Sequence, residues 1–496
     1  MEKLVENKRL LSKEKIKVSF LNQYLTNNLY FAGLVIFCCI SFLAVYILDD
    51  FVDYIDILTS VIWMIFLLSL LLFSPKFIVK YMYLVFLVIT NLVGVFIIEN
   101  TDIYLYELRA QSEDYNSLWV LSWVHFIFIV CLYIFDNVFD NKFVNKMSKD
   151  KERWIYKGKD IGDIILIFVG LGFILISLIL LVLVMKNGTA HQLKIDRFEY
   201  GDRFLHGFWG SLNNIISYIV PVIALLLIKK YKLISFVMIG LYFVYLFFIG
   251  VKFGTFLTSV CFLLPVFFIE NKKVDIKKIV GIIVLLVVAL LGVVFAFNRM
   301  VYNAEAGGNI AYLKDRGAQQ GQLWWAVYGD YESQDYHVGE FVKDELGIIV
   351  NSQAKENYNH GIYKVMKITA PSNVVEAKIE TGSTYAYSTQ ASLYYYFNYI
   401  GLFVFDVFGA LLLSFFTNIY WGALSGNRLI ESVIVLKFVY NSYWVIGQSD
   451  ITSFFAIKKM FYLFVAVVWG WMIILRYRRF SFTPCLKTKR ITSMIN

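Results

Sequence analysis

The chain carries repeated apolar runs, each close to the length of about 20 residues that an α-helix needs to cross a bilayer. We place roughly twelve such runs, by that length criterion, at residues 30–48, 55–74, 80–98, 118–135, 161–185, 212–228, 233–250, 254–269, 279–298, 397–421, 430–447 and 455–475. The chain is 59% hydrophobic and only 17% charged, which is far more apolar than a soluble globular protein. The predicted fold class is therefore an all-α polytopic membrane protein.

Lysine and arginine placement predicts the orientation of the chain in the membrane. Basic stretches such as "KDKERWIYKGK", "KKYK" at 229–232, "NKKVDIKK" at 271–278 and "RYRR" at 476–479 fall in alternate connections. The connections between them are acidic or nearly uncharged. The positive-inside rule then puts both termini in the cytoplasm, and the even number of runs agrees.

The polar segments divide the chain into five predicted parts. These are a cytoplasmic amphipathic N-terminus at 1–29, transmembrane spans one to nine at 30–298, an extracytoplasmic loop at 299–396, spans ten to twelve at 397–475 and a basic cytoplasmic tail at 476–496. The 299–396 loop is too long for a bare connection, so we expect it to form a small subdomain that contains the substrate site. Its residue spacing predicts short helices near 321–331 and 340–350.

Several classes of protein and of site are disfavoured by the same pattern. The net charge of +9 is distributed in short segments between apolar runs, which indicates a membrane rather than a nucleic-acid partner. Few spans carry ionisable residues, Asp406 and Lys437 being the clearest, whereas an ion-coupled pump would be expected to carry more. The large loop has no Asp-x-Asp and its histidines are scattered. We therefore predict no metal and no cofactor.

The stretch "RGAQQGQLWWAVYGD" at 316–330 combines amide side chains with adjacent indole rings. Amides offer donors and acceptors to sugar hydroxyls, and aromatic faces stack on the C–H faces of sugar rings. An interfacial helix in the aromatic belt is the competing interpretation. The predicted glycan-binding residues are Gln319, Gln320, Gln322, Trp324 and Trp325.

Positive side chains also gather on the predicted outer face, where the positive-inside rule expects few. Arginine offers a fork of donors to phosphate and lysine a mobile point charge. The predicted phosphate or pyrophosphate ligands are Arg197, Arg203, Lys252, Arg299, Arg316 and Lys364. Lys252 stands between Gly250 and Gly254, which would allow a bulky headgroup to approach. A snorkelling lysine is the alternative for that position.

Three stretches in fixed order carry a family resemblance. "RGAQQGQLWWAVYGD" (316–330), "HGIYKVMKITAP" (360–371) and "GSTYAYSTQASLYYYFNYIGL" (382–402), with "GVKF" (250–253) upstream, resemble the bacterial O-antigen and capsule repeat-unit polymerases of the Wzy type. The resemblance covers chiefly residues 250–402 and the number of spans. It implies a GT-C-like membrane glycosyltransferase in the bacterial inner membrane, with an active site on the extracytoplasmic side.

The resemblance also implies a reaction. A growing glycan would pass from undecaprenyl pyrophosphate to the non-reducing end of an incoming undecaprenyl-pyrophosphate-linked repeat unit, without a metal. Cations would stabilise the leaving pyrophosphate, and a general base would assist the acceptor hydroxyl. The candidate catalytic residues are Arg316, His337, Glu340 and His360, with Asp330 and Glu332 as further acids. Lipid-linked glycans and membrane lipids are the expected ligands, and a chain-length regulator and a flippase the expected partner proteins.

Three other functions stay open at the level of sequence. An O-antigen ligase would share the topology and the donor but would transfer to a lipid A core. A lipid-linked oligosaccharide flippase would need charged residues in a cavity between two similar halves, a pattern that the sequence does not show. A non-enzymatic assembly partner would have no need of clustered outer cations.

Overall fold

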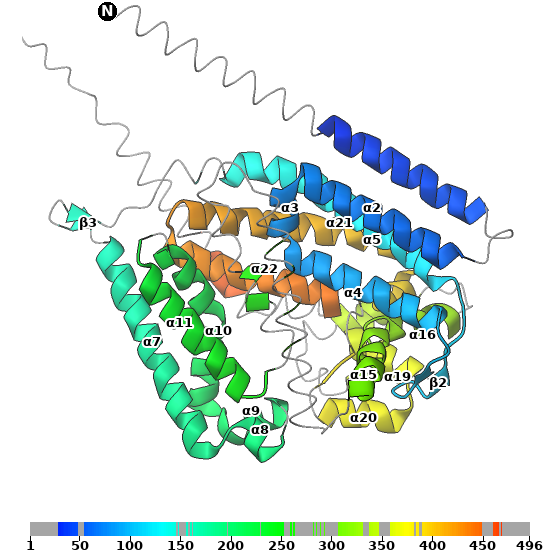
Figure 1. Ribbon diagram of the computed structural model, residues 1–496. Helices are drawn as coiled ribbons and strands as arrows, with labels where there is room; N and C mark the ends of the chain where they lie inside the picture. The colour runs from blue at the N-terminus through cyan, green and yellow to red at the C-terminus, as the bar shows by residue number, and fades with distance from the viewer. Residues whose placement is uncertain are drawn as a thin grey trace, which may run out of the picture.

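A computed structural model of the chain shows a bundle of long helices flanked by short ones (Figure 1). The structure describes residues 28–47, 54–144, 147, 155–156, 159–160, 162–195, 197–228, 230–251, 258–259, 261–262, 281, 284, 288, 292, 306–330, 337–346, 358–380, 383–385, 389–448, 460–465 and 468. Among these residues, 8 helices are long and apolar enough to cross a membrane. They are Asn28–Ile47, α2 (Ile55–Phe73), α4 (Met82–Glu99), α5 (Ser117–Phe139), α7 (Gly162–Asn187), α10 (Gly207–Ile228), α21 (Thr389–Ser425) and α22 (Leu429–Gln448).

The helices confirm the predicted fold class at the level of an all-α membrane protein. Each of the 8 helices overlaps a predicted span, although α21 begins at Thr389, inside the predicted 299–396 loop, and the run at 233–250 appears as the shorter apolar helix α11 (Lys232–Phe248). The predicted spans 254–269, 279–298 and 455–475 lie largely outside the described residues, so the total number of spans stays a prediction. The strands of the described part are two short antiparallel hairpins, β1 (Tyr104–Leu105) with β2 (Ala110–Gln111) and β3 (Ile155–Tyr156) with β4 (Lys159–Asp160).

The apolar helices differ in how much of their surface is covered by protein. In α5, 61% of the most apolar stretch of the helix is buried by other parts of the protein. This helix packs along α21 at the centre of the bundle. In α7, only 22% is buried, and large side chains such as Phe168 and Met185 point away from the protein. A helix that is apolar all round suits a lipid environment. The main core therefore lies between α2, α4, α5, α21 and α22, while α7, α10 and α11 share a second core beside it.

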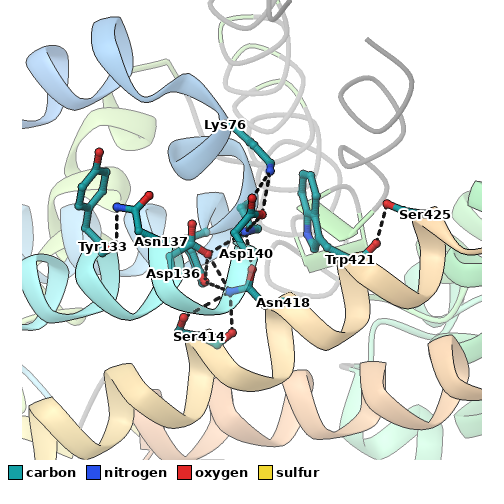
Figure 2. Close-up of polar contacts among 11 residues, drawn as sticks. Lys76, Tyr133, Asp136, Asn137, Asp140, Ser414, Asn418, Trp421 and Ser425 are labelled. Atoms are coloured by element: carbon teal, nitrogen blue, oxygen red, sulfur yellow. Dashed lines mark hydrogen bonds and ion pairs between the residues drawn. The ribbon is translucent and has the colours of Figure 1, made fainter. Parts of the chain in front are cut away.

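A buried polar network joins three helices at one end of the bundle (Figure 2). Lys80, the last residue of α3 (Pro75–Lys80), has a fully buried side chain. Its ammonium lies 2.7 Å from Asp136 and 2.9 Å from Asp140, and it donates to Asn418 Oδ1 at 2.8 Å. The amide of Asn418 donates to Asp136 at 2.8 Å. A nearby second lysine, Lys76, binds Asp140 at 2.7 Å, so two cations balance two carboxylates.

Close backbone contact holds the turn between α15 (Ala306–Ala318) and α16 (Gln322–Asp330) against α4. We call residues 318–321 the elbow. A Cβ atom at Gly321 would lie 2.3 Å from the backbone nitrogen of Val95, and one at Gly94 would lie 2.5 Å from the nitrogen of Gly321. Asn91, one helical turn along α4, donates to the carbonyl of Gln320 at 2.7 Å. The missing side chains of these glycines are what allow the two backbones to meet.

The segments between α15 and α21 form an outer cluster with its own apolar core. Its helices are α16, α17 (Val338–Phe341), the π-helical turn η3 (Val342–Leu346), α19 (Gly361–Thr369) and α20 (Ser372–Glu380). They share buried residues with the 101–116 connection, which carries the hairpin β1–β2, and with the first part of α21. The short helices predicted near 321–331 and 340–350 correspond to α16 and to α17 with η3. The bounds of the predicted subdomain stay a prediction.

Helix α21 is two helices separated by a sharp reversal at Asn398. This residue has φ 55° and ψ −156°, which no helix accommodates. Thr389 and Gln390 line the same cavity as Asp406 and Gly409, although 16 residues of straight helix would separate Gln390 from Asp406 by about 24 Å. The segment 389–397 therefore folds back along the start of the segment 399–425.

Substituting Gly321 by alanine should push the elbow away from α4, because the new Cβ would meet backbone atoms of α4 that cannot move aside. We expect a loss of about 1–3 kcal/mol in the free energy of unfolding, measured as a lower unfolding temperature of the purified protein in detergent. Gly339→Ala is the matched control, since nothing lies within 4 Å of its added Cβ. Equal unfolding temperatures for the two variants would contradict the close-contact interpretation.

Substituting Lys80 by methionine should leave Asp136 buried beside a group that no longer carries a charge. Breaking a buried ion pair in this way costs about 3–5 kcal/mol. Lys76→Met removes a lysine whose side chain is 45% exposed, and an exposed pair contributes no more than about 1 kcal/mol. Thermal unfolding of both variants should show a large loss for the first and a small one for the second; the reverse order would show that Lys80 is not a structural anchor.

Candidate functional site

Four polar side chains of the outer cluster meet at one place. Glu340 on α17 lies 2.9 Å from the ammonium of Lys364 on α19 and accepts a hydrogen bond of 2.9 Å from the hydroxyl of Tyr395. His337 precedes α17; its Nδ1 lies 3.4 Å from Glu340, and its ring stacks on that of Tyr395 at 4.6 Å. The structure thus brings together His337, Glu340 and Lys364, three residues that the sequence nominated separately. We call these four residues the outer polar site.

The contacts within the outer polar site stabilise the charged forms of Glu340 and Lys364. The hydrogen bond from Lys364 lowers the pKa of the Glu340 carboxyl, against the raising effect of burial, and the contact with Tyr395 lowers it further. Burial alone would lower the pKa of the Lys364 ammonium, but Glu340 and Asp344 more than offset this and raise it. Glu340 is therefore ionised and able to accept a proton or a hydrogen bond, while the side chain stays 43% exposed.

The prediction that Lys364 is a pyrophosphate ligand does not fit these contacts. Its ammonium is shared between Glu340 at 2.9 Å and Asp344 at 3.6 Å. Two carboxylates more than neutralise one ammonium, so an anionic group would meet net negative charge there. Lys364 instead positions Glu340.

Arg316 and Gln319 lie together at the C-terminal end of α15, where the Arg316 side chain is exposed. The guanidinium of Arg316 donates to Gln319 Oε1 at 2.8 Å and to the hydroxyl of Tyr312 at 3.1 Å, over whose ring it also lies. The contacts that the described residues make with this guanidinium are thus to neutral groups, which leave its charge available to an anion. A predicted phosphate ligand and a predicted sugar ligand therefore stand side by side.

The elbow fixes the position of Gln320 as well. Its carbonyl accepts the hydrogen bond from Asn91, whose own amide oxygen lies 3.0 Å from Nε2 of the fully buried His125 on α5. The Gln320 side chain donates to the carbonyl of Arg316 at 3.3 Å. Sequence patterns do not predict that Asn91 and His125 support the elbow, because these residues come from two apolar spans more than 190 residues away.

The remaining predicted sugar ligands are packing residues in this structure. Trp324 and Trp325 are only 1% and 3% exposed, and their indole N–H groups donate to the carbonyls of Ser117 and Glu113. Gln322 is 1% exposed and donates to Glu107 at 2.5 Å. The prediction of stacking platforms at these positions is therefore corrected: the indoles are covered because they fill the space between α16, α5 and the 101–116 connection.

Among the described residues, the predicted cations Arg197 and Arg203 do not join Arg316. Arg203 forms an ion pair with Glu199 one turn away on α9 (Arg197–Phe204), and Arg197 is exposed at the start of the same helix. Helix α9 belongs to the core of α7, α10 and α11. Lys252 and Arg299 lie outside the described residues, as does Glu332, and the side chain of Asp330 is also outside them.

His360 occupies the N-cap position of α19 and is 7% exposed. Its ring centroid lies 5.7 Å from that of Tyr363. The adjacent backbone N–H of Gly361 donates to the buried carboxylate of Glu345. His360 therefore belongs to the packing at the start of α19, where an acceptor sugar would not reach it in this conformation.

Asp406 lines a small cavity at the N-terminal end of the 389–397 segment. The side chain is 4% exposed, and Gln390 beside it is 2% exposed. One oxygen of each is buried without a hydrogen-bond partner in the described part of the chain. The cavity is otherwise apolar, lined by residues such as Phe128 and Leu412. The sequence singled out Asp406 as an ionisable group inside a span, but only the reversal at Asn398 shows that an amide faces it.

These features describe an all-α membrane protein with a polar site on the side predicted to face away from the cytoplasm. Residues 355–463 match a family of unknown function (DUF6418). That match includes α19, α20, α21 and α22, and so the reversal at Asn398. No curated protein and no solved structure matches the chain.

The lowered pKa of Glu340 predicts a pH-dependent contribution to stability. A carboxyl whose pKa is lower in the folded than in the unfolded chain stabilises the fold at pH values above its ordinary pKa of 4.5. This stabilisation is lost as the pH falls through the pKa of the group in the folded chain. Because solvent screens a half-exposed group, the contribution is at most about 1 kcal/mol. At neutral pH the unfolding temperature of the wild type should be higher than that of Glu340→Gln. Below pH 4.5 the two unfolding temperatures should become equal.

Glu376→Gln, an exposed acid on α20, is the control and should show no such convergence. A constant difference between wild type and Glu340→Gln across this pH range would contradict the assigned pairing.

Proposed function

We propose that this protein is a membrane glycosyltransferase that polymerises lipid-linked oligosaccharide repeat units on the extracytoplasmic side of a bacterial cytoplasmic membrane. The observation that carries the proposal is the pairing of Arg316 with Gln319 at an elbow seated on the spanning helix α4. A lipid-linked sugar presents its phosphate and its first sugar together at the membrane edge. A guanidinium and an amide held side by side next to a spanning helix match that combination.

The donor would be a glycan on undecaprenyl pyrophosphate. Its bond between the sugar C1 and the pyrophosphate oxygen breaks, and the charge that develops on that oxygen is stabilised by the Arg316 guanidinium. A fork of N–H donors gives this stabilisation without a metal. The rigid seat of the elbow on α4 supports it, because a donor that is already in place needs no reorganisation during the reaction.

The acceptor would be the non-reducing sugar of an incoming repeat unit on the same carrier. Its hydroxyl oxygen forms the new bond to C1, and its proton passes to Glu340 or His337 in the outer polar site. Glu340 is ionised, and it accepts from Lys364 and Tyr395 in the resting state. Helix α16 has nine residues and so is about 13 Å long; it leads from the elbow to Tyr328, which packs on Tyr394 beside the outer polar site. Because the leaving oxygen and the acceptor hydroxyl both contact the same C1, proton transfer to Glu340 or His337 requires the elbow and the outer polar site to close on one sugar during the reaction.

The same proposal names the partners. Undecaprenyl-pyrophosphate-linked glycans and membrane lipids are the ligands. A chain-length regulator and a flippase are the partner proteins that such a reaction would require, since repeat units must be delivered outside the cytoplasm and the polymer must end.

Replacing Arg316 with alanine should reduce polymerisation at least about 100-fold, the effect of removing one donor that stabilises a developing oxyanion. Expression and folding should be retained, because the side chain is exposed and makes only local hydrogen bonds. The measurement is elongation of synthetic undecaprenyl-pyrophosphate repeat units by the purified protein in lipid nanodiscs. Lys343→Ala, which removes another exposed cation of the outer cluster, should elongate them normally.

Other outcomes of this assay separate the alternatives. Wild-type protein that transfers the glycan only to a lipid A core would be a ligase. Protein that moves the lipid-linked unit across the membrane without forming a glycosidic bond would be a flippase. Normal elongation by Arg316→Ala would remove Arg316 from the site and with it the main support for the proposal.

A further inference from the structure

Three carboxylates converge at the predicted outer ends of the first helices of the bundle, away from the outer polar site. Asp56 comes from the first turn of α2, Glu99 is the last residue of α4, and Asp114 lies in the 101–116 connection just before α5. One oxygen atom from each lies within 4.8 Å of the others. The three residues are thus far apart in sequence and close together in space.

The contacts around these carboxylates are unusual for negatively charged groups. Asp56 is 8% exposed, and its Oδ1 is buried with no hydrogen-bond partner among the described residues. Its other oxygen accepts from Asn100 at 2.5 Å. Glu99 accepts from the backbone N–H groups of Ser117 and Leu118 at 2.8 and 3.1 Å. None of the ion pairs in the described part of the chain includes Asp56, Glu99 or Asp114, so no lysine or arginine there balances them.

Buried negative charge without a compensating cation is strongly unfavourable. Two neighbouring carboxylates can reduce the unfavourable energy of buried negative charge by sharing a proton. A third carboxylate close to the same two is better explained by a bound cation. A cation at this point would offset the charge of Asp56, whose Oδ1 has no hydrogen-bond partner among the described residues. The exposed Asp114 gives the point a route to solution.

We infer that Asp56, Glu99 and Asp114 bind a Ca²⁺ ion. All three ligands offer oxygen, which hard cations prefer over the softer metals that seek nitrogen or sulfur. Calcium binds oxygen at about 2.3–2.6 Å, so two ligands on opposite sides of the ion lie up to about 5 Å apart. The 4.8 Å spread fits this limit. Water at the Asp114 side would complete the coordination, and the smaller, stricter Mg²⁺ suits the spread less well.

The ion would act as a structural clamp rather than as part of the proposed transferase chemistry. It would join the ends of α2 and α4 to the connection that leads into α5. The carbonyl of Ser117, whose N–H is bound by Glu99, accepts the indole N–H of Trp324 at 3.1 Å. The clamp would therefore be linked to α16 by two hydrogen bonds through Ser117. The inference does not depend on the proposed function.

The test compares thermal unfolding of the full-length protein in detergent, after chelator treatment, in millimolar Ca²⁺, in millimolar Mg²⁺ and in chelator. Wild type should unfold at a temperature at least about 3 °C higher in Ca²⁺ than in chelator, because a ligand that binds only the folded state stabilises it. Mg²⁺ should give less than half of that shift. Asp56→Asn and Asp114→Asn should lose the Ca²⁺ shift, whereas Glu113→Gln, the adjacent exposed acid, should keep it.

Asp114→Asn keeps the test decisive, because this exposed residue can be changed without disturbing the buried core even if Asp56→Asn fails to fold. Direct binding is measured on the same samples by calorimetric titration with Ca²⁺, which should show one site in wild type and none in Asp114→Asn. Identical unfolding temperatures of wild type in Ca²⁺ and in chelator would overturn the inference. A Ca²⁺ shift that survives in Asp114→Asn, or that is lost equally in Glu113→Gln, would also overturn it.

Discussion

The ammonium of Lys80 is the contact on which the arrangement of the bundle depends. The Lys80 side chain is fully buried, so its charge must be matched within the protein. Asp136, Asp140 and the amide oxygen of Asn418 provide this match, and Lys76 balances the second carboxylate by binding Asp140. Because the partners come from α3, α5 and α21, any sliding of one helix along another would leave a buried charge unpaired. A purely apolar interface between the same helices would permit such sliding.

The far end of the same helices carries the candidate chemistry, and its geometry follows from contacts that leave no room for side chains. The elbow rests on α4 through Gly94 and Gly321, and the amide of Asn91 locks the carbonyl of Gln320. Arg316 and Gln319 are then presented on a rigid support, while Trp324 and Trp325 fill the space behind them. The candidate ligands Arg316 and Gln319 and the two tryptophans come from one stretch of fifteen residues, and Asn91 and Gly94 on α4 support the turn between them.

Hydropathy was enough to predict the 8 long apolar helices of the described part, because a span must satisfy its backbone hydrogen bonds within the helix and its length is set by the bilayer. It was not enough to predict which aromatic side chains face outward. Trp324 and Trp325 have the composition of a sugar-stacking surface, yet they are core residues, because their neighbours in space come from α5 and the 101–116 connection. Glu340, His337 and Lys364 were each nominated from the sequence. Their pairing, and the part played by Tyr395, required the fold.

The short segment 389–397 has one end in each of two cores. Tyr395 and Tyr396 pack in the outer cluster, while Thr389 donates to the carbonyl of Val445 on α22 and Gln390 faces Asp406 inside the bundle. A helix of this length is stiff, so it behaves as a rod with a single joint at Asn398. A tilt of this segment at its Tyr395 end would therefore move Gln390 relative to Asp406 in the cavity that both residues line.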